Sequence, residues 1–366
     1  MKKVLFETHH LYYWPNFLPV IFELLKRKDY VINVSMPRRS TMKQDDILAA
    51  ECKKLNIQFI SSMTEESRID KILKEAFDII VVGNVGQLNK IILPKAIAVM
   101  VYHGIGLKQS YYNDIDDRIN IRAVESLARM NELKGYGHKN LVLTGFTKLD
   151  RLYNISDNSV KNIVDKLHLN PNKKTILYAP SFYPTSIEKI CPFLSELSQD
   201  HNIIIKLHGF SWEQRKYHYQ NILCSELSKN NPDIHLLPNE EFDIIPFYLI
   251  ANILITDISS TMFEYLPLNR PIIQAECYSL KLKHRLFSRR FWKKMDIKRH
   301  DCVDFTYKLS EPDDLLSRVY YALDNQSEMA DKRKTACKDH LFKNDGLASS
   351  RLVNAIEKYQ DENSCI

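Results

Sequence analysis

The fold of this chain is decided by the stretch Ile253-Leu-Ile-Thr-Asp-Ile-Ser-Ser-Thr-Met-Phe-Glu264-Tyr-Leu-Pro-Leu-Asn-Arg-Pro-Ile-Ile273. Its first residues, 253–255, form a short apolar run that predicts a buried strand. Polar residues follow the strand, and apolar residues at helical spacing come next. A second strand is predicted at 271–273 after a short helix. The stretch therefore predicts a strand–helix–strand unit with parallel strands.

Hydroxyl side chains fill the turn between this first strand and the helix. The strand ends at Asp257, and Ser259, Ser260 and Thr261 follow it. Such a turn presents backbone N–H groups and the positive end of a helix dipole, which together seat a phosphate. At the carboxyl ends of parallel strands, this predicts a site for a nucleotide diphosphate. The alternative is a ligand-free helix start, because serine and threonine are ordinary N-caps and Thr261-x-x-Glu264 is a capping box.

Length and composition predict a globular protein of two domains. The chain has 366 residues, of which 45% are hydrophobic and 26% are charged. No apolar stretch is long enough to span a membrane, and the amino terminus lacks the apolar core of a signal peptide, so we expect a cytoplasmic protein. The seven cysteines include no C-x-x-C pair, which favours reduced thiols and predicts neither a zinc site nor a disulfide framework. The net charge of +6 suits an anionic substrate or membrane surface.

Strands and helices alternate along the whole chain. In the first half, strands are predicted at 4–6, 31–34, 58–60, 79–82, 98–101 and 141–144, and helices at 17–28, 46–54 and 69–76. In the second half, strands are predicted at 175–178, 203–207, 234–236, 253–255 and 271–273, with a final helix at 349–358. This pattern predicts an α/β protein with two Rossmann-like, doubly wound domains that face a cleft. We place the amino-terminal acceptor domain at 1–160 and the nucleotide-donor domain at 161–345. A C-terminal helix at 346–366 is expected to pack back across the junction.

A glycine-rich cluster, Tyr102-His-Gly-Ile-Gly-Leu-Lys108, follows the predicted strand at 98–101. His103 at a strand end is a candidate general base near neutral pH. Gly104 allows the backbone to approach a ligand closely, and Lys108 can neutralise a phosphate. The alternative is a glycine turn with a hydrogen-bonded histidine and no ligand.

Two more polar clusters follow strands of the second half. Ser181 comes after the strand at 175–178 and can donate to a phosphate, although a Pro-Ser turn needs no function. Lys206 and His208 end the strand at 203–207 and lie on the same side by the period-2 rule. Burial of two cationic or hydrogen-bond-donating groups at the end of a strand costs free energy unless an anion pairs with them, so the two residues favour a phosphate site. A solvated strand end is the alternative.

A basic segment lies between residues 281 and 300. It holds nine Lys or Arg residues against one Asp, interleaved with leucine and aromatic residues. This composition is typical of an element that lies on anionic lipid or grips a polyanionic chain, whereas a solvated charged face is the alternative. No nucleic-acid motif accompanies it, and no nucleic-acid partner is expected. The residues assigned to this contact are Arg285, Arg289, Arg290, Trp292, Lys293 and Lys294.

Taken in order, these motifs resemble the CDP-glycerol glycerophosphotransferase family of teichoic-acid and capsule synthesis. The matching segments are Tyr102-His-Gly-Ile-Gly-Leu-Lys108, Thr144-Gly-Phe-Thr-Lys-Leu-Asp150, Ile176-Leu-Tyr-Ala-Pro-Ser181, Ile205-Lys-Leu-His208, the stretch 253–273 and Asn344-Asp-Gly-Leu-Ala-Ser-Ser-Arg351. The resemblance implies a GT-B architecture, with no metal and no cofactor at the transfer step. It also implies a reaction in which glycerol phosphate, or a related polyol phosphate, moves from a CDP-linked donor to a hydroxyl of a lipid-linked saccharide or surface polymer. CMP is the product that leaves.

The resemblance further implies roles for individual residues. His103 matches a base that deprotonates the acceptor hydroxyl, with Gly104 and Lys108 beside the acceptor or its phosphate. His208 and Lys206 match a motif that contacts the donor phosphate. The donor set is completed by Ser181, Asp257, Ser259, Ser260 and Thr261 around the pyrophosphate and by Glu264 at the ribose hydroxyls.

Two other functions remain open from the sequence. A GT-B glycosyltransferase that uses a UDP- or CMP-sugar shares the fold and the phosphate turn. A non-catalytic protein that binds membranes or polyanions rests on the basic segment alone. In the main interpretation, the basic segment holds the enzyme peripherally on the inner face of the cell membrane or grips the anionic polymer.

Overall fold

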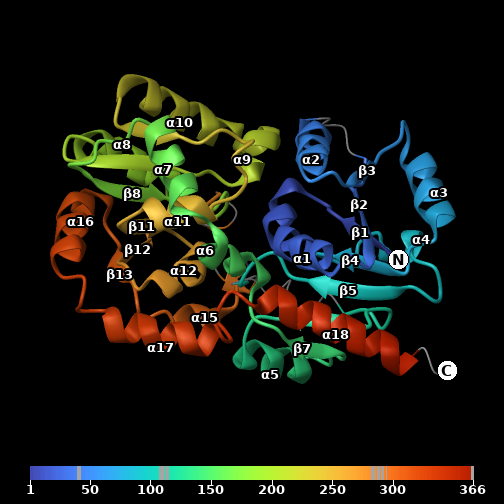
Figure 1. Ribbon diagram of the computed structural model, residues 1–366. Coiled ribbons are helices and arrows are strands. Elements are labelled where there is room, and N and C mark those ends of the chain that lie inside the picture. Colours follow the sequence, from blue (N-terminus) through green and yellow to red (C-terminus); the bar gives the residue numbers. More distant parts are fainter. Residues whose placement is uncertain are drawn as a thin grey trace. The chain divides into compact units, whose positions relative to one another are not determined.

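In the computed structural model, the chain forms two compact α/β units (Figure 1). The structure describes residues 1–38, 43–106, 112, 115–281, 284, 286, 289, 292–293 and 295–363. The first unit consists of Met1–Gly104, Tyr112–Tyr153 and Asp339–Ile366, and the second of Ile105–Tyr111 and Asn154–Lys338. The chain changes unit after residues 104, 111, 153 and 338, and the sequence places its two domain boundaries after 160 and 345.

The first unit is built on a parallel sheet of seven strands in the order β3-β2-β1-β4-β5-β6-β7. Val4 illustrates the register, because it lies opposite Ile32 on one side and Ile79 on the other. The strands are β1 (Lys2–Glu7), β2 (Tyr30–Ser35), β3 (Gln58–Ile60), β4 (Ile79–Val82), β5 (Ile97–Val101), β6 (Ile121–Val124) and β7 (Leu141–Leu143). Strand β4 is wholly apolar and buried, as expected for a parallel strand covered on both faces.

Helices and 3-10 turns connect these strands. They are η1 (Leu11–Tyr13), α1 (Trp14–Arg27), α2 (Lys43–Lys54), α3 (Glu65–Glu75), α4 (Leu88–Ile91), α5 (Leu127–Gly135), η3 (Thr147–Asp150), α6 (Arg151–Asn154) and α18 (Ala348–Asn363). The last of these, α18, packs on α1, where Arg27 Nη2 donates to Asn354 Oδ1 at 2.6 Å. The carboxy-terminal helix is thus part of the first unit.

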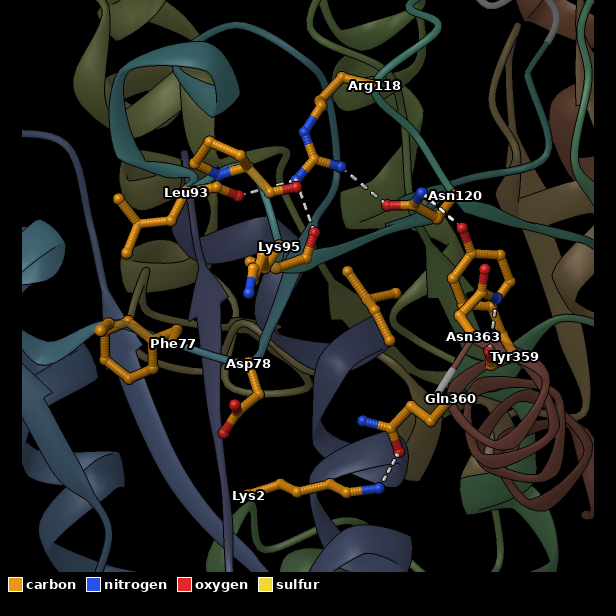
Figure 2. A pocket seen from close by; sticks show the side chains of 14 residues that line it. Lys2, Phe77, Asp78, Leu93, Lys95, Arg118, Asn120, Tyr359, Gln360 and Asn363 are labelled. Carbon is orange, nitrogen blue, oxygen red and sulfur yellow. Dashed lines mark hydrogen bonds between the residues drawn. The ribbon is translucent and has the colours of Figure 1, made fainter. Parts of the chain in front are cut away.

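A cavity of about 510 Å³ lies at the amino ends of the strands, beside α18 (Figure 2). Its polar groups bond to one another. Asn120 Nδ2 donates to Tyr359 OH at 2.9 Å, and Arg118 donates to the backbone carbonyls of Leu93 and Ala96. The bond from Asn120 to Tyr359 ties α18 to the amino ends of the strands, opposite their carboxyl ends.

The second unit contains a parallel sheet of six strands in the order β10-β9-β8-β11-β12-β13. The strands are β8 (Lys174–Tyr178), β9 (His201–Ile205), β10 (Ile234–Leu236), β11 (Ile253–Thr256), β12 (Ile272–Ala275) and β13 (Tyr307–Leu309). They are connected by α7 (Asp157–Lys166), α8 (Ile187–Leu197), α9 (Gly209–Glu213), η4 (Arg215–Tyr217), α10 (His218–Asn230), α11 (Ile245–Ile250), α12 (Thr261–Glu264), η5 (Leu266–Leu268), α15 (Ile297–Asp301), η6 (Pro312–Asp314), α16 (Leu315–Asp324) and α17 (Ala330–His340).

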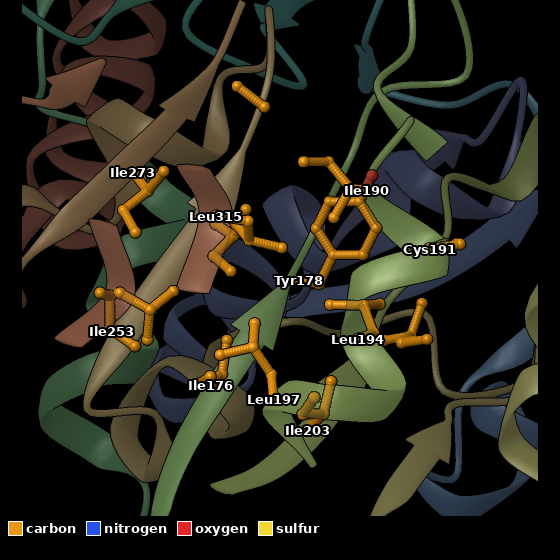
Figure 3. Close-up of a cluster of buried hydrophobic side chains, with 14 of the residues drawn as sticks. Ile176, Tyr178, Ile190, Cys191, Leu194, Leu197, Ile203, Ile253, Ile273 and Leu315 are labelled. Atoms are coloured by element: carbon orange, nitrogen blue, oxygen red, sulfur yellow. The ribbon is translucent and has the colours of Figure 1, made fainter. Parts of the chain in front are cut away.

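The core of the second unit lies between this sheet and the helices α8 and α16. Figure 3 shows Ile176 and Tyr178 of β8 beside Ile190 and Leu194 of α8, with Leu315 of α16 close by. All five side chains are fully buried. Burial of a large apolar side chain stabilises a fold by about 1.5–3 kcal/mol, so this cluster holds strand β8 in place. The loop that follows β8 forms part of the candidate site.

Both sheets share one topological feature. In each sheet, the first strand lies in the interior and the next two strands are added on one side of it. The chain then crosses back, and the remaining strands are added on the other side. The reversal falls between β1 and β4 in the first sheet and between β8 and β11 in the second. Loops that follow these four strands leave in opposite directions, and ligands of such folds bind outside the carboxyl ends at this switch point.

The predicted α/β class with two doubly wound sheets is confirmed. Every predicted strand is present, with ends within two residues of the prediction. Two strands lie outside the predictions, β6 and β13. A charge interrupts the apolar pattern of each: Arg122 in β6, buried with its Nη1 donating to Tyr102 OH at 2.9 Å, and Lys308 in β13.

Candidate active site

The turn between β11 and α12 holds its hydroxyl groups in a chain of hydrogen bonds. Thr256 Oγ1 donates to the carbonyl oxygen of Ala179 at 2.8 Å and lies 2.8 Å from Thr261 Oγ1. Thr261 Oγ1 in turn donates to Ser259 Oγ at 3.0 Å. Ser259, Ser260 and Thr261 are half-buried, so this hydroxyl edge borders solvent at the carboxyl end of β11.

Glu264 lies on the core side of the same turn and is 1% exposed. Its Oε1 accepts from Ser260 Oγ at 2.8 Å, and its Oε2 accepts from Tyr248 OH at 3.0 Å. Burial and the neighbouring Glu264 raise the pKa of Tyr248 well above its usual value. The capping box expected at Thr261 is wrong, because α12 begins after Ser260 and the Glu264 carboxylate bonds the Ser260 hydroxyl.

Asp257 ties together the two loops that flank the switch point of the second sheet. Its carboxylate is fully buried. Oδ1 accepts from the backbone N–H of Ser181 at 2.7 Å, and Oδ2 accepts from Ser186 N at 3.0 Å and Ser186 Oγ at 3.1 Å. Burial raises the pKa of Asp257 to about 7, although these hydrogen bonds favour the charged form. Asp257 therefore holds the loop after β8 against the turn after β11.

The loop held by Asp257 leads to His208. Ser181 Oγ donates to the carbonyl oxygen of Pro184 within that loop. The ring of Phe182 lies 4.7 Å from the ring of His208 and 5.1 Å from that of Tyr217, measured between centroids. Rings at these spacings pack favourably, so the position of Phe182 sets the position of the histidine. The structure thus connects Ser181, Asp257 and His208 at one edge of the second sheet.

Lys206 and His208 do not share a strand face, because β9 ends at Ile205. The period-2 interpretation of the pair is therefore wrong. His208 instead caps α9, with its Nδ1 accepting from Phe210 N at 3.1 Å. Lys206 Nζ donates to the carbonyl oxygen of Leu207 at 3.0 Å. Both side chains are half-buried and remain at the carboxyl edge.

In the first unit, His103 follows β5 and lies against two tyrosine rings. The centroid of its ring is 5.1 Å from that of Tyr12 and 4.6 Å from that of Tyr13. Asn16 Nδ2 donates to the backbone oxygen of His103 at 3.4 Å. The histidine is half-buried and Gly104 behind it is buried, so the imidazole has a defined place at the carboxyl edge of the first sheet.

Tyr13, Gly83 and Asn84 support His103 and lie outside the sequence predictions. A Cβ on Gly83 would lie 2.0 Å from Cδ1 of Tyr13, so only glycine leaves room for the ring. Asn84 Nδ2 donates to Tyr13 OH at 2.8 Å. The sequence does show a Gly-Asn pair directly after the strand at 79–82, the kind of position where site residues are expected. It does not show that Tyr13, far away in the chain, packs against this pair.

We expect Gly83→Ala to destabilise the protein by about 1–3 kcal/mol, because the added methyl group overpacks the Tyr13 ring. Displacement of Tyr13 also removes a wall of His103, so activity should fall with stability. Urea unfolding measures the first effect. The control is Gly135→Ala, where the methyl group meets open space and a change of about 0.4–1 kcal/mol in the stabilising direction is expected. Equal stability of the two variants would contradict the packing argument.

The basic segment is only partly described. Arg289 and Lys293 are exposed and Trp292 is half-buried. Four residues assigned from the sequence lie outside the described residues: Lys108, Arg285, Arg290 and Lys294. Across the described part of the chain, no helix combines the length and apolar character needed to cross a membrane. The same residues contain no cluster of three or more His, Cys, Asp or Glu side chains suited to a metal ion.

Lys281, at the start of the basic segment, contacts the loop that carries Phe182. Its Nζ lies 5.0 Å from the centre of the Tyr183 ring and 4.9 Å from that of Tyr217. The ammonium group over two aromatic faces is a cation–π arrangement, worth about 0.5–1 kcal/mol at an exposed site. The basic segment therefore begins next to the aromatic cluster around His208.

Comparison with known proteins places this chain in a family. Residues 127–358 match the family model described as CDP-glycerol:poly(glycerophosphate) glycerophosphotransferase. A teichoic acid poly(glycerol phosphate) polymerase of Bacillus spizizenii is 31% identical over 147 residues, which are 37% of this chain and 34% of the relative. A teichoic acid glycerol-phosphate primase of Bacillus subtilis is 31% identical over 128 residues, 33% of this chain and 30% of the relative. These matches span about a third of the length of each relative.

Solved structures share the fold. A variant of the wall teichoic acid polymerase TagF soaked with CDPG superposes with a TM-score of 0.72 at 15% identity, over 99% of this chain and 89% of that one. A UDP-N-acetylglucosamine 2-epimerase from Listeria monocytogenes gives a TM-score of 0.67 at 15% identity, over 99% and 97% of the two chains.

Two doubly wound parallel sheets, with polar turns at the carboxyl ends of the strands of each, give the chain the GT-B fold that it shares with these structures. Within that fold the family is shown by the match over residues 127–358, which is most of the chain. The chain belongs to the CDP-glycerol:poly(glycerophosphate) glycerophosphotransferase family. The family resemblance seen in the sequence is thereby confirmed.

Proposed function

We propose that this protein transfers glycerol phosphate, or a related polyol phosphate, from a CDP-linked donor to a hydroxyl of a saccharide or surface polymer. The family match over residues 127–358 carries the proposal, because it includes the loops after β8, β9 and β11. The acceptor oxygen attacks the phosphorus that bears the polyol, the bond from that phosphorus to CMP breaks, and CMP leaves.

The second unit supplies the donor seat in this proposal. Ser181, His208 and the hydroxyl edge at 259–261 lie at the carboxyl ends of neighbouring strands, where a diphosphate binds in doubly wound sheets. Lys206 adds a positive charge. Glu264 remains the acid proposed for the ribose hydroxyls, and it must reach them from a buried position in which its carboxylate bonds Ser260 and Tyr248. Charge develops on the leaving phosphate during transfer, and positioned donors at this edge stabilise it.

The first unit supplies the base. His103 accepts the proton of the acceptor hydroxyl as the oxygen attacks, and Gly104 and Lys108 follow it within the next five residues. The support is the position of His103 after β5 and the fixed geometry given to its ring by Tyr12 and Tyr13. A base that acts on the acceptor must hold its orientation, because a small displacement costs much of the rate.

A panel of nucleotide donors tests the reaction. Pure protein is incubated with CDP-glycerol, CDP-ribitol, a UDP-sugar and a CMP-sugar, each with a saccharide acceptor, and the released nucleotide is measured. CMP release from CDP-glycerol or CDP-ribitol is expected. UDP release, or CMP release only from the CMP-sugar, would indicate a glycosyltransferase. Absence of turnover with every donor would indicate a binding protein.

We further propose that the acceptor is lipid-linked or polymeric and that the protein works peripherally at the inner face of the cell membrane. The support is the basic segment, in which Arg289 and Lys293 are exposed beside half-buried Trp292. Reversal of both charges, Arg289→Glu with Lys293→Glu, is expected to weaken sedimentation with vesicles of anionic lipid. Each basic residue near such a surface contributes about 1 kcal/mol.

The matched control for this test is Lys161→Glu with Lys229→Glu, two exposed lysines of the same unit, which changes the net charge equally. If the two double variants sediment alike, attraction depends on net charge and the basic segment has no special role at the membrane.

A further inference from the structure

The first sheet has a pocket of its own at its switch point. A cavity of about 320 Å³ opens beyond the carboxyl ends of β1, β2 and β4. Its walls include His10, Tyr12, Arg38, Glu65, Asn84 and Gln87. A crevice at the reversal between β1 and β4 is where doubly wound sheets bind ligands. The volume lies at the small end of the range of about 300–1,000 Å³ for ligand pockets, so it suits one small unit.

The lining combines hydrogen-bonding groups with an aromatic face. Arg38 and Gln87 come from loops on different sides of the pocket, and Asn84 lies between β4 and α4. The rings of His10 and Tyr12 are stacked, with centroids 5.1 Å apart and planes at 15°. Within the described residues, Gln87 Oε1 is buried and accepts no hydrogen bond. A buried acceptor of this kind calls for a donor such as a ligand hydroxyl.

The acids around the pocket outnumber the arginines, which argues against an anion as its main occupant. Arg68 is buried between two acids, with Nη1 3.0 Å from Glu7 Oε2 and Nη2 2.6 Å from Glu65 Oε1. The backbone N–H of Arg38 donates to Glu65 Oε2 at 2.8 Å. Burial alone would raise the pKa of Glu65, but its bonds to Arg68 and Arg38 hold it below the usual value. Two arginines thus face two acids, and Asp45 adds a further acid near Arg38.

The pocket is coupled to the proposed base. Tyr13 lines the pocket and also packs against His103 at 4.6 Å between ring centroids. Asn84 donates to Tyr13 OH at 2.8 Å and accepts from Gly86 N at 2.9 Å, so one amide joins the pocket wall to the tyrosine. A ligand in the pocket therefore lies one side chain away from the imidazole.

We propose that this pocket binds a single uncharged, polyhydroxylated unit of the acceptor, through its vicinal hydroxyls, and so directs a neighbouring hydroxyl to His103. The assignment rests on the proposed transferase function. Carboxylate, amide and guanidinium groups match hydroxyls as acceptors and donors, and the His10–Tyr12 face covers the apolar side of a sugar ring or polyol. The unit has two sources, the sugar of a lipid-linked saccharide or the terminal glycerol of a glycerol-phosphate chain.

Saturation-transfer NMR on the protein of residues 1–366 tests the proposal directly, without turnover. The probes are a methyl glucoside, sn-glycerol 3-phosphate and inorganic phosphate. Binding of the glucoside or the glycerol phosphate is expected, with affinity reduced about fivefold or more in Gln87→Ala and in His10→Ala, since each removes a contact worth about one hydrogen bond. Gln199→Ala, an exposed glutamine of the second unit, is the matched control and should bind both probes as the wild type does.

The two polyhydroxyl probes distinguish the sources. A preference for the glucoside indicates a saccharide acceptor, and a preference for glycerol phosphate indicates a growing polymer. The pocket is not an acceptor subsite if inorganic phosphate competes fully with both probes, or if neither pocket variant changes their binding. In steady-state assays, the same variants should raise KM for the acceptor and leave KM for CDP-glycerol unchanged.

The NMR readout separates this inference from the proposed function. A wild-type protein that releases no CMP from CDP-glycerol overturns the reaction, whether or not the pocket binds polyols. A protein that releases CMP normally, but whose pocket variants bind both probes as tightly as the wild type, overturns the pocket alone.

Discussion

His103→Ala is expected to lower the rate of transfer by about 10²–10⁴-fold, the usual contribution of a general base. The imidazole lies 4.6 Å from Tyr13 and 5.1 Å from Tyr12, between ring centroids, so its loss removes a positioned proton acceptor. The residue belongs to the first unit, whereas the donor seat belongs to the second, so affinity for CDP should stay unchanged. Single-turnover rates and CDP titration measure the two quantities separately.

His218→Ala serves as the control, because this exposed histidine at the start of α10 belongs neither to the donor-binding site nor to the surroundings of His103. His103→Gln adds a second variant that retains a polar side chain of similar reach without the basic nitrogen. Transfer at the wild-type rate in both His103 variants would make this histidine structural. A parallel loss of CDP affinity would instead place it among the donor contacts.

Asp257→Asn should have the second large effect, and the effect should depend on pH. Burial raises the pKa of Asp257 to about 7 from its usual 3.8, which corresponds to about 4 kcal/mol. Because the folded state holds the proton more tightly, this stabilisation is complete below about pH 4 and is lost as pH rises through about 7. Asparagine cannot titrate, so the difference in unfolding free energy between variant and wild type should shift in favour of the variant over that range.

The same substitution should weaken donor binding at neutral pH. An asparagine amide has a single acceptor oxygen, so it cannot accept both from Ser181 N and from Ser186 N and Oγ as the carboxylate does. The loop that carries Phe182 therefore loses part of its anchor beside His208. Urea unfolding at several pH values and KM for CDP-glycerol are the measurements. Asp313→Asn, at an exposed position of the same unit, is the control. Stability curves for Asp257→Asn and wild type that stay parallel across the range would show that the carboxylate titrates as an ordinary acid.

The strands of both sheets could be predicted from the sequence, because parallel strands that are covered on both faces consist of continuous apolar runs. The strand at 79–82, for example, is predicted and observed with the same ends. Prediction failed where a charge lies inside a strand, as Arg122 does in β6, because its partner Tyr102 OH is visible only in the folded protein. It also failed at the end of β9, where His208 caps a helix and does not extend the strand.

The polar clusters of the site were predicted by their position after strands, but not the directions of their side chains. Asp257 lies at a strand end, where the sequence predicts a residue that contacts phosphate, but its carboxylate faces inward to Ser181 and Ser186. That direction depends on the β8 loop, about seventy residues earlier in the chain. Gly83 carries no signal of its role either, since its lack of a side chain matters only because Tyr13 occupies the space.

The central claim is that the second unit holds a cytidine diphosphate donor at the carboxyl edge of its sheet. The most direct measurement is the structure of the protein crystallised and soaked with CDP. The diphosphate is expected beside the hydroxyl edge at 259–261, within reach of His208. A soaked crystal with no CDP at that edge, or with CDP bound elsewhere on the protein, would contradict the account.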